Sequence, residues 1–199
     1  SGTCFFYKLH IVLVNFKLRH ICVFSIKKLM KSKGNIVFLG MMGSGKTSIG
    51  KLFSQKHKIK FYDTDKSIEN NLGMKISKIF TIKGETFFRN FEEKITLDIL
   101  KKRNIIIALG GGSFLNKKIQ KEVLKNHTSF WLNWDKSTII NRIKNSSKRP
   151  VAYKASINEL NNLIKKRSNI YAKALYKINC DGLSKIEIVK KIFDLYETN

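Results

Sequence analysis

A glycine-rich segment directly after an apolar run is the strongest constraint on how this chain can fold. Residues 40–47 read GMMGSGKT and match the pattern G-x-x-x-x-G-K-[ST], and the apolar run 36–39 comes immediately before them. A helical pattern begins at Lys46. A strand, a glycine-rich loop and a helix in this order form the setting in which the pattern is a phosphate-binding P-loop. A turn that only reversed the chain would need neither Lys nor Thr at fixed offsets.

Each residue type in this loop has a chemical reason to be there. Glycines let the backbone turn tightly, so that successive N–H groups point inward as an anion-binding nest at the N-terminus of a helix. Lys46 is expected to reach the β and γ phosphates of a nucleotide, and Thr47 to ligate Mg²⁺. The loop therefore predicts a nucleotide substrate and one Mg²⁺ ion.

The composition fits one globular domain with a basic surface. The 199 residues are 43% hydrophobic and carry a formal net charge of +25. Such an excess can neutralise nucleic-acid phosphates, and a basic nucleic-acid-binding protein with a vestigial P-loop is one competing hypothesis. However, the lysines are scattered along whole helices instead of forming one stripe, which favours an acidic, phosphorylated small ligand. We expect no nucleic-acid partner and no membrane partner.

The 3 cysteines, Cys4, Cys22 and Cys180, are odd in number and widely spaced, so they predict neither a disulfide framework nor a zinc site. A reducing cytoplasm fits this usage, and we expect a cytoplasmic monomer.

Residues 1–34 form a basic extension without an acidic residue. This bias resembles a transit peptide, but serine is sparse, and the apolar run 11–14 is too short for a signal-peptide core or a membrane span. We interpret Met30 as a natural starting residue and the residues before it as an upstream segment. The extension is expected to lie outside the fold, which is expected to occupy residues 35–199.

From Asn35 onward, apolar runs alternate with helical patterns. Helices are expected from Lys46, as two short pieces over 66–84, as a longer helix opened by Gly84, and over 135–144. Capping-box spacing predicts two more, one over 156–174 and one from Ser184. The predicted strands are 36–39, 59–62, 105–109, 129–132 and 176–180. This alternation predicts an α/β fold with a five-stranded parallel sheet.

Chemistry-bearing residues follow the first three predicted strands. The P-loop follows the first, 63–65 (Asp-Thr-Asp) follows the second, and 110–112 (three glycines) follows the third. Ligands bind at the carboxyl ends of parallel strands, so this convergence predicts an enzyme. The carboxylates could be simple turn formers. Beside a P-loop, one could instead hold Mg²⁺ through a water while the other accepts a proton from an acceptor hydroxyl.

Two arginines outside these strand ends are also candidates. Arg89 lies three residues before Glu92, so the pair could be a plain surface ion pair. In the functional interpretation, Glu92 orients Arg89, whose guanidinium grips a substrate carboxylate. Arg149, in the polar loop 145–156, could lie in an exposed turn or on a lid that closes over the transferred phosphoryl group.

Six blocks of this sequence, taken together, resemble the shikimate kinase family from about Asn35 to the C-terminus. The blocks are residues 40–47, 63–65, 84–93, 109–112, 149–150 and 166–171. The resemblance implies a P-loop, nucleoside-monophosphate-kinase-like three-layer fold with a substrate-binding region at about 65–93 and a lid at about 145–156. It implies transfer of the ATP γ-phosphoryl group to the 3-hydroxyl of shikimate, a step toward chorismate and the aromatic amino acids. The implied partners are ATP or ADP and shikimate.

The resemblance also implies a role for each matched residue. Arg142 falls where the family has an arginine that stacks on adenine, and Asp63 where a carboxylate serves the metal. The expected catalytic residues are Lys46, Asp65 and Arg149. The expected nucleotide-binding residues are Gly43, Ser44, Gly45, Lys46, Thr47, Ser48, Arg142 and Arg149. The expected shikimate-binding residues are Asp65, Phe80, Phe88, Arg89, Gly111 and Arg167. The expected metal-site residues are Thr47 and Asp63.

Three positions depart from the family pattern. Asn169 stands where proline is usual, Val151-Ala152 replaces the common Leu-Leu, and Thr47-Ser48 inverts the common Ser-Thr. The last departure is chemically neutral, because either hydroxyl can ligate Mg²⁺. A kinase of another small polyol acid, such as gluconate, is the nearest competing hypothesis. Arg89, Arg167 and the three glycines favour shikimate over it.

Overall fold

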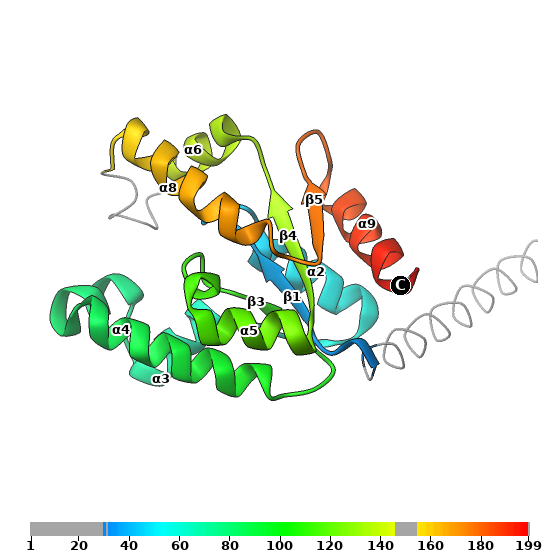
Figure 1. The fold of residues 1–199 in the computed structure, drawn as a ribbon, viewed down its shortest axis with the longest axis horizontal. Coiled ribbons are helices and arrows are strands. Elements are labelled where there is room, and N and C mark those ends of the chain that lie inside the picture. Colours follow the sequence, from blue (N-terminus) through cyan, green and yellow to red (C-terminus); the bar gives the residue numbers. More distant parts are fainter. Residues whose placement is uncertain (1–29, 31, 146–154, 199) are drawn as a thin grey trace, which may run out of the picture.

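Five parallel strands form one sheet in the order β2-β3-β1-β4-β5 (Figure 1). The computed structural model describes Met30, residues 32–145 and residues 155–198. The strands are β1 (Ile36–Leu39), β2 (Lys60–Asp63), β3 (Ile105–Ala108), β4 (Thr128–Asn133) and β5 (Tyr176–Asn179). The predicted α/β class and the five parallel strands are confirmed. No end of an observed strand differs from its predicted position by more than one residue.

The helices connect consecutive strands and cover both faces of the sheet. They are α2 (Lys46–His57), α3 (Thr64–Leu72), α4 (Ile76–Leu100), α5 (Lys117–Asn126), α6 (Lys136–Lys144), α8 (Ile157–Tyr171) and α9 (Lys185–Glu197), with a 3-10 turn, η1 (Ser113–Leu115). Parallel strands need such crossovers, because each must restart at the same edge of the sheet. The P-loop lies between β1 and α2, as predicted.

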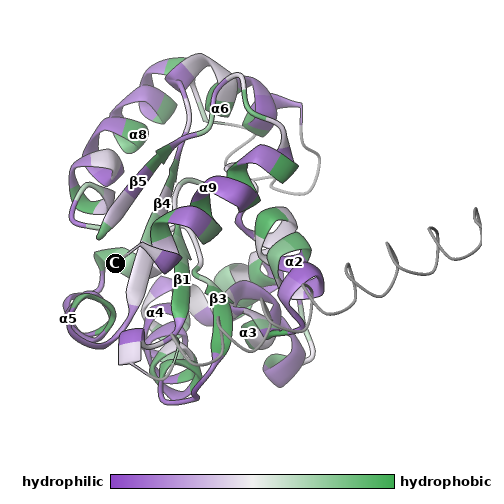
Figure 2. Ribbon diagram, turned by 90° about the vertical axis from the view of Figure 1, so that its right-hand side faces the viewer, coloured by the Kyte–Doolittle hydropathy of each residue, from purple (hydrophilic) through white to green (hydrophobic). Residues whose placement is uncertain are grey.

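The sheet has a hydrophobic core on each face because successive side chains of a strand point to opposite sides. Ile36 and Phe38 pack into the core under α2 and α9, whereas Val37 and Leu39 pack into the core under α4, α5, α6 and α8. Every residue of β1 and β3 is buried, but the edge strand β2 exposes Lys60. Figure 2 shows the hydrophobic strands inside and hydrophilic residues on the outer surfaces of the helices. A smaller third core joins α3 to α4.

Local signals fixed several helix ends correctly. In α8 the Ser156 side chain accepts a hydrogen bond from the N–H of Glu159, and the Glu159 carboxylate accepts one from the N–H of Ser156. The capping box at the start of α9 has the same geometry. Gly84 has φ 78° and ψ 171° and kinks α4, so the predicted break at this residue is confirmed. These torsions lie where residues other than glycine are strained.

The sequence analysis missed α5. Its first turn is capped by Asn116, whose side chain accepts hydrogen bonds from the N–H groups of Lys118 and Ile119. Ile119 and Val123 are buried one turn apart against β4, which lies next along the chain. The cap and the four-residue spacing were present in the sequence, but only two apolar positions mark this short helix.

The packed part of the chain begins before the predicted boundary at residue 35. Met30 is buried in the core beneath α2 and α9. Lys33 Nζ donates a hydrogen bond to the carbonyl of Tyr196, and the Tyr196 hydroxyl donates one to the carbonyl of Gly34. These contacts lie before residue 35 and were not expected, because a single buried methionine gives no periodic signal. Residues 1–29 lie outside the described residues. Among those that are described, no helix combines the length and apolar content needed to cross a bilayer.

His57, the last residue of α2, lies between two aromatic rings. Its ring centroid is 4.4 Å from that of Phe53 and 4.7 Å from that of Phe193. Nε2 is buried without a hydrogen-bond partner. Burial, together with the nearby charge of Lys56, lowers the pKa of His57 from 6.5 to about 4. The fold therefore holds this histidine neutral.

Stability should fall on mild acidification because of His57. Above about pH 6.5 the side chain is neutral in both states, and between pH 6.5 and about 4 only the unfolded chain takes up the proton. The loss at pH 5 is about 2 kcal/mol for these pKa values. His57→Phe, which keeps the aromatic stack, should remove this share of the loss. Denaturant unfolding of the wild type and of His57→Phe at pH 7 and pH 5 measures the loss of stability in each protein. An equal loss in the two proteins would contradict the prediction.

Candidate active site

The P-loop, residues 40–47, turns at the carboxyl end of β1 on three glycines. Gly40, Gly43 and Gly45 have φ values of 141°, 82° and 87°, all in the range that favours glycine. A Cβ on Gly40 would lie 2.9 Å from the carbonyl oxygen of Leu132. Gly45 is the N-cap of α2, so the unpaired first N–H groups of that helix face the loop. This arrangement can bind an anion, as the sequence predicted.

The Lys46 ammonium group lies within the loop itself. Its Nζ donates hydrogen bonds to the carbonyl of Gly40 over 2.8 Å and to that of Met41 over 3.0 Å, and the residue is buried. A buried ammonium needs such acceptors. The positive charge of Lys46 is therefore held against the backbone of the P-loop.

Thr47 and Asp63 lie next to each other, as a shared metal site requires. Thr47 Oγ1 donates to Asp63 Oδ2 over 2.6 Å. The other carboxylate oxygen, Oδ1, accepts from the N–H of Lys66 and caps the N-terminus of α3. The cap fixes the carboxylate so that its second oxygen points at the first turn of α2. Hydroxyl and carboxylate oxygens of this kind suit Mg²⁺.

Asp65 faces the glycine turn that follows β3. A Cβ on Gly110 would lie 2.4 Å from Asp65 Oδ1 and 2.8 Å from Ser113 Oγ. Thr64 joins the two segments: its buried Oγ1 accepts from the N–H of Gly110 over 2.8 Å and donates to the carbonyl of Ala108. The glycine is thus required by close approach, and the Asp65 carboxylate is held at the floor of the site.

Arg89, which is partly exposed, forms an ion pair on α4 with the buried Glu92. Arg89 Nη1 donates to Glu92 Oε2 over 2.7 Å, while Glu92 Oε1 accepts from Ser113 Oγ, also over 2.7 Å. Burial favours a lower pKa for Arg89, but hydrogen bonds to Glu92 and Glu85 outweigh it and raise the pKa above its ordinary value. Glu92 is therefore not part of a plain surface ion pair. Its carboxylate is buried, and its two oxygens bind one residue of α4 and one of η1.

Two phenylalanines line the space beside Arg89. The ring centroids of Phe80 and Phe88 are 4.6 Å apart, and the guanidinium carbon of Arg89 lies 5.0 Å from the Phe88 centroid. The two rings belong to the two halves of α4 on either side of Gly84. The two rings and the guanidinium of Arg89 therefore lie side by side.

Arg167 approaches the glycine turn from α8. Its Nη1 would lie 3.4 Å from a Cβ on Gly111, and Nε and Nη1 are buried without a hydrogen-bond partner among the described residues. Tyr171, one helical turn on, donates a hydrogen bond from its hydroxyl to the carbonyl of Gly111. Burial raises the pKa of Tyr171 to about 12, so it stays a donor at all physiological pH values. The tyrosine fixes the glycine turn beside Arg167.

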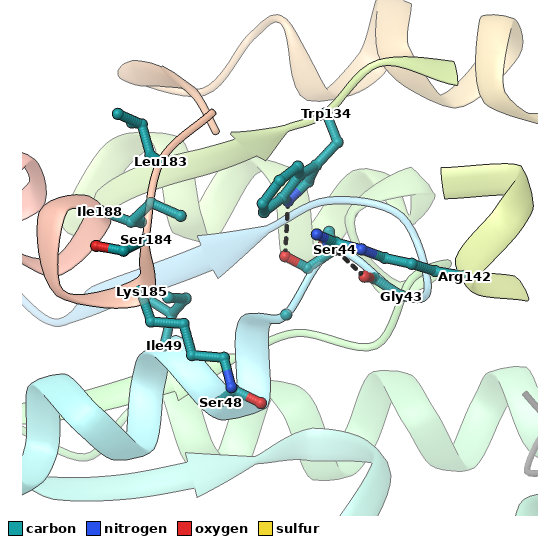
Figure 3. Close-up of a pocket in the computed structure, with 11 residues that line it drawn as sticks. Gly43, Ser44, Ser48, Ile49, Trp134, Arg142, Leu183, Ser184, Lys185 and Ile188 are labelled. Carbon is teal, nitrogen blue, oxygen red and sulfur yellow. Dashed lines mark hydrogen bonds between the residues drawn. The ribbon is translucent and has the colours of Figure 1, made fainter. Parts of the chain in front are cut away.

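A cavity of about 410 Å³ lies beside the P-loop, between it and residues of α6 and α9 (Figure 3). It is lined by Gly43, Ser44, Gly45, Ser48, Ile49, Trp134, Arg142, Leu183, Ser184, Lys185 and Ile188. Five of these residues are predicted nucleotide-binding residues. Arg142 reaches the cavity from α6, as the resemblance implied, and its guanidinium lies against the ring of Trp134.

Comparisons with known proteins identify the family. A family model described as shikimate kinase matches residues 42–197. The chain belongs to the shikimate kinase family. It is 37% identical over 158 residues to the shikimate kinase of Sulfurihydrogenibium sp. (strain YO3AOP1), covering 79% of this chain and 95% of that protein. It is 38% identical over 176 residues to that of Bacillus subtilis (strain 168), covering 82% of this chain and 92% of that protein.

A solved structure supports the same family. A shikimate kinase from Acinetobacter baumannii, in complex with shikimate, matches with a TM-score of 0.80 and 25% identity, covering 87% of this chain and 98% of that chain. The predicted fold and activity are confirmed: the chain is a P-loop enzyme that phosphorylates shikimate with ATP in aromatic biosynthesis. The family match decides between the two polyol-acid kinases that the sequence left open.

The structure brings the predicted site residues of this shikimate kinase to one edge of the sheet. Arg149 and most of the predicted lid lie outside the described residues. Sequence reasoning missed four residues that hold the site together: Thr64, Ser113, Trp134 and Tyr171. Thr64 and Tyr171 stand inside blocks that carry the resemblance, and Trp134 directly follows β4. The signal that could have identified Trp134 is its position at the carboxyl end of the fourth predicted strand.

Removing the charge of Glu92 should loosen Arg89. In Glu92→Gln the neutral amide binds the guanidinium less strongly, so we expect the shikimate KM to rise about tenfold or more, with a smaller effect on kcat. Glu93→Gln is the matched control, because the Glu93 carboxylate accepts hydrogen bonds from Asn116 and Lys118. Steady-state kinetics with varied shikimate measure both variants. Equal shikimate KM values for the two would contradict the role of Glu92.

Proposed function

We propose that this chain transfers the γ-phosphoryl group of ATP to the 3-hydroxyl of shikimate, with Lys46, Asp65 and Arg149 as catalytic residues. The observation that carries the proposal is the pair of buried, unpaired donors on Arg167, beside Gly111. Two buried guanidinium donors without an acceptor among the described residues are costly, so the site suits an anionic ligand that supplies one.

Shikimate has the chemistry that these residues can bind. Its carboxylate would accept hydrogen bonds from Arg167 and Arg89, whose guanidinium groups both lie against the glycine turn 110–112. Its ring would lie on the apolar wall of Phe80 and Phe88. The absence of a Cβ at Gly111 would let the ring approach the backbone, which the Tyr171 hydroxyl holds in place.

Asp65 would act on the acceptor hydroxyl. Its carboxylate lies at the same edge of the sheet as the P-loop and close to Gly110. An ionised carboxylate at this position can orient the hydroxyl and take its proton as the oxygen attacks the phosphorus.

The residues present fit one Mg²⁺ ion. Thr47 and Asp63 supply hard oxygen donors 2.6 Å apart, and the described residues contain no cluster of three or more His, Cys, Asp or Glu residues that would hold a metal by themselves. Mg²⁺ bound through few protein ligands and the nucleotide phosphates matches its usual coordination. When bound, the ion would neutralise charge on the phosphates. Thr47 would bind it directly, and Asp63 would orient its water.

Lys46 and the first N–H groups of α2 would bind the phosphates. The ammonium group would exchange the carbonyls of Gly40 and Met41 for phosphate oxygens. Gly43, Ser44, Gly45 and Ser48 would contact the nucleotide on the side of the cavity, where Arg142 would stack on the adenine. We also propose a cytoplasmic monomer that binds neither nucleic acid nor membrane.

The acceptor can be tested directly. Purified protein with Mg²⁺ and ATP should release ADP when shikimate is added and not when gluconate is added, because only shikimate matches the paired arginines and the glycine turn. A coupled ADP assay measures the rate, and the product is identified by mass and by its phosphorylated position. Turnover with gluconate alone would sink the proposal.

Asp65→Asn should lower kcat by more than about tenfold, because the amide cannot take the hydroxyl proton and general-base catalysis typically contributes 10² or more. Asp98→Asn is the control, because this exposed carboxylate near the end of α4 forms an ion pair with Lys101. Kinetics at saturating substrates compare the two. A near-normal kcat in Asp65→Asn would reduce Asp65 to a turn former.

Arg167→Met should separate stability from function. The variant loses two buried donors that have no partner in the ligand-free fold, so its unfolding midpoint should not fall. It should nevertheless lose shikimate binding by about a hundredfold, as expected for a charged bidentate contact. Lys166→Met, on the adjacent exposed position, is the control. Calorimetric titration with shikimate and thermal unfolding provide the two measurements; tight binding by Arg167→Met would refute the assignment.

A further inference from the structure

Trp134 links the end of β4 to the P-loop. It follows β4 directly, and its indole Nε1 donates a hydrogen bond to the carbonyl of Ser44 over 2.9 Å (Figure 3). An N–H donor on a large ring has few acceptors to choose from in a half-buried setting. The bond therefore fixes both the indole and the peptide group between Ser44 and Gly45.

The same indole carries Arg142 on its face. The guanidinium carbon of Arg142 lies 3.7 Å from the centroid of the Trp134 ring, within the range of a strong cation–π contact. Nη1 of Arg142 donates to the carbonyl of Gly43 over 3.3 Å. Trp134 and Arg142 thus bind adjacent P-loop carbonyls and each other. The last turn of α6, the end of β4 and the P-loop form one connected unit.

This contact orders a side chain that would otherwise be mobile. Arg142 is exposed, and an exposed arginine samples many rotamers whose loss opposes ligand binding. Stacking on the indole places the guanidinium at the rim of the cavity before a nucleotide arrives. Preorganisation of this kind raises affinity by lowering the entropy lost on binding.

The opposite wall of the cavity suits a flat, apolar-faced group. Leu183 and Ile188 approach from the β5–α9 side, across from Trp134 and Arg142 (Figure 3). A ring system held between aliphatic side chains and a guanidinium keeps its edges accessible to solvent and backbone. The P-loop end of the cavity holds the phosphate-binding groups, so a nucleoside base and its phosphates would bind as one ligand.

We propose that Trp134 is a positioning residue for the nucleotide, because its ring holds the Arg142 guanidinium flat at the rim of the cavity. The inference rests on the proposed function, in which Arg142 stacks on the adenine. It adds a residue that neither the sequence motifs nor the family resemblance assigned to the site.

A purely structural role makes a different prediction. Part of the indole packs against both hydrophobic cores of the sheet, so truncating it costs stability in either case. A structural role would lower the unfolding midpoint without a selective change in nucleotide affinity. A positioning role acts through Arg142, and removing Trp134 should then have little effect once Arg142 is gone.

The test is a double-mutant cycle on binding of ADP with Mg²⁺, measured by calorimetry without shikimate. Trp134→Leu and Arg142→Ala should each weaken ADP binding by about tenfold, and the double variant should be no more than about twofold weaker than Arg142→Ala. The shikimate KM should stay within about twofold of the wild type. The proposal would be overturned if Trp134→Leu bound ADP as tightly as the wild type. It would also be overturned if the loss of ADP affinity in the double variant equalled the product of the losses in the two single variants.

Fluorescence provides a second readout that survives if Trp134→Leu folds poorly. The chain has 2 tryptophans, and Trp131 is buried in β4. ADP with Mg²⁺ should change the emission of the wild type and of Trp131→Phe but not of Trp134→Phe. A response that persists in Trp134→Phe would contradict the proposal. Both experiments omit shikimate, so a failure of the proposed acceptor would show in turnover and leave these comparisons intact.

Discussion

The register of the parallel sheet is the constraint on which the site depends. Ala108 of β3 is the register partner of Phe38 in β1 and of Asp63 in β2. Two residues beyond these partners stand Gly40, Asp65 and Gly110. One pairing pattern therefore brings the start of the P-loop, the proposed base and the glycine turn to the same level of the same edge. A slip by one residue in either ladder would reverse the side chains of a strand and separate these groups.

Buried polar contacts then hold this edge together. Thr64 joins the start of α3 to the turn after β3, Glu92 joins α4 to η1, and Tyr171 joins α8 to the turn. Each contact links elements that are distant in sequence, and each buried group has a partner that offsets its desolvation. Arg167 differs, because two of its donors are unsatisfied. Among the described residues, Nε and Nη1 of Arg167 therefore remain available to a ligand.

The sequence predicted most of what depends on neighbouring residues. The P-loop, the strand ends, the two capping boxes and the break at Gly84 are all encoded within a few residues of the place where they act. The contact of Trp134 with Ser44 spans 90 positions and that of Tyr171 with Gly111 spans 60. No periodicity or motif reports such pairs, since they depend on how whole helices pack. The early start of the fold at Met30 was missed for the same reason: its partners lie in α2 and α9.

The kink at Gly84 sets how the side chains of the proposed acceptor pocket lie relative to one another. Phe80 belongs to the rigid segment before it, whereas Phe88 and Arg89 belong to the segment after it. A Cβ at Gly84 would meet nothing within 4 Å, so the residue is required by its backbone torsions alone. The relative position of the two rings therefore depends on one pair of dihedral angles, those of Gly84. A change in the backbone conformation at Gly84 could therefore adapt the site to a different acceptor molecule by moving the two rings apart or together. Every side chain that lines the site could stay the same.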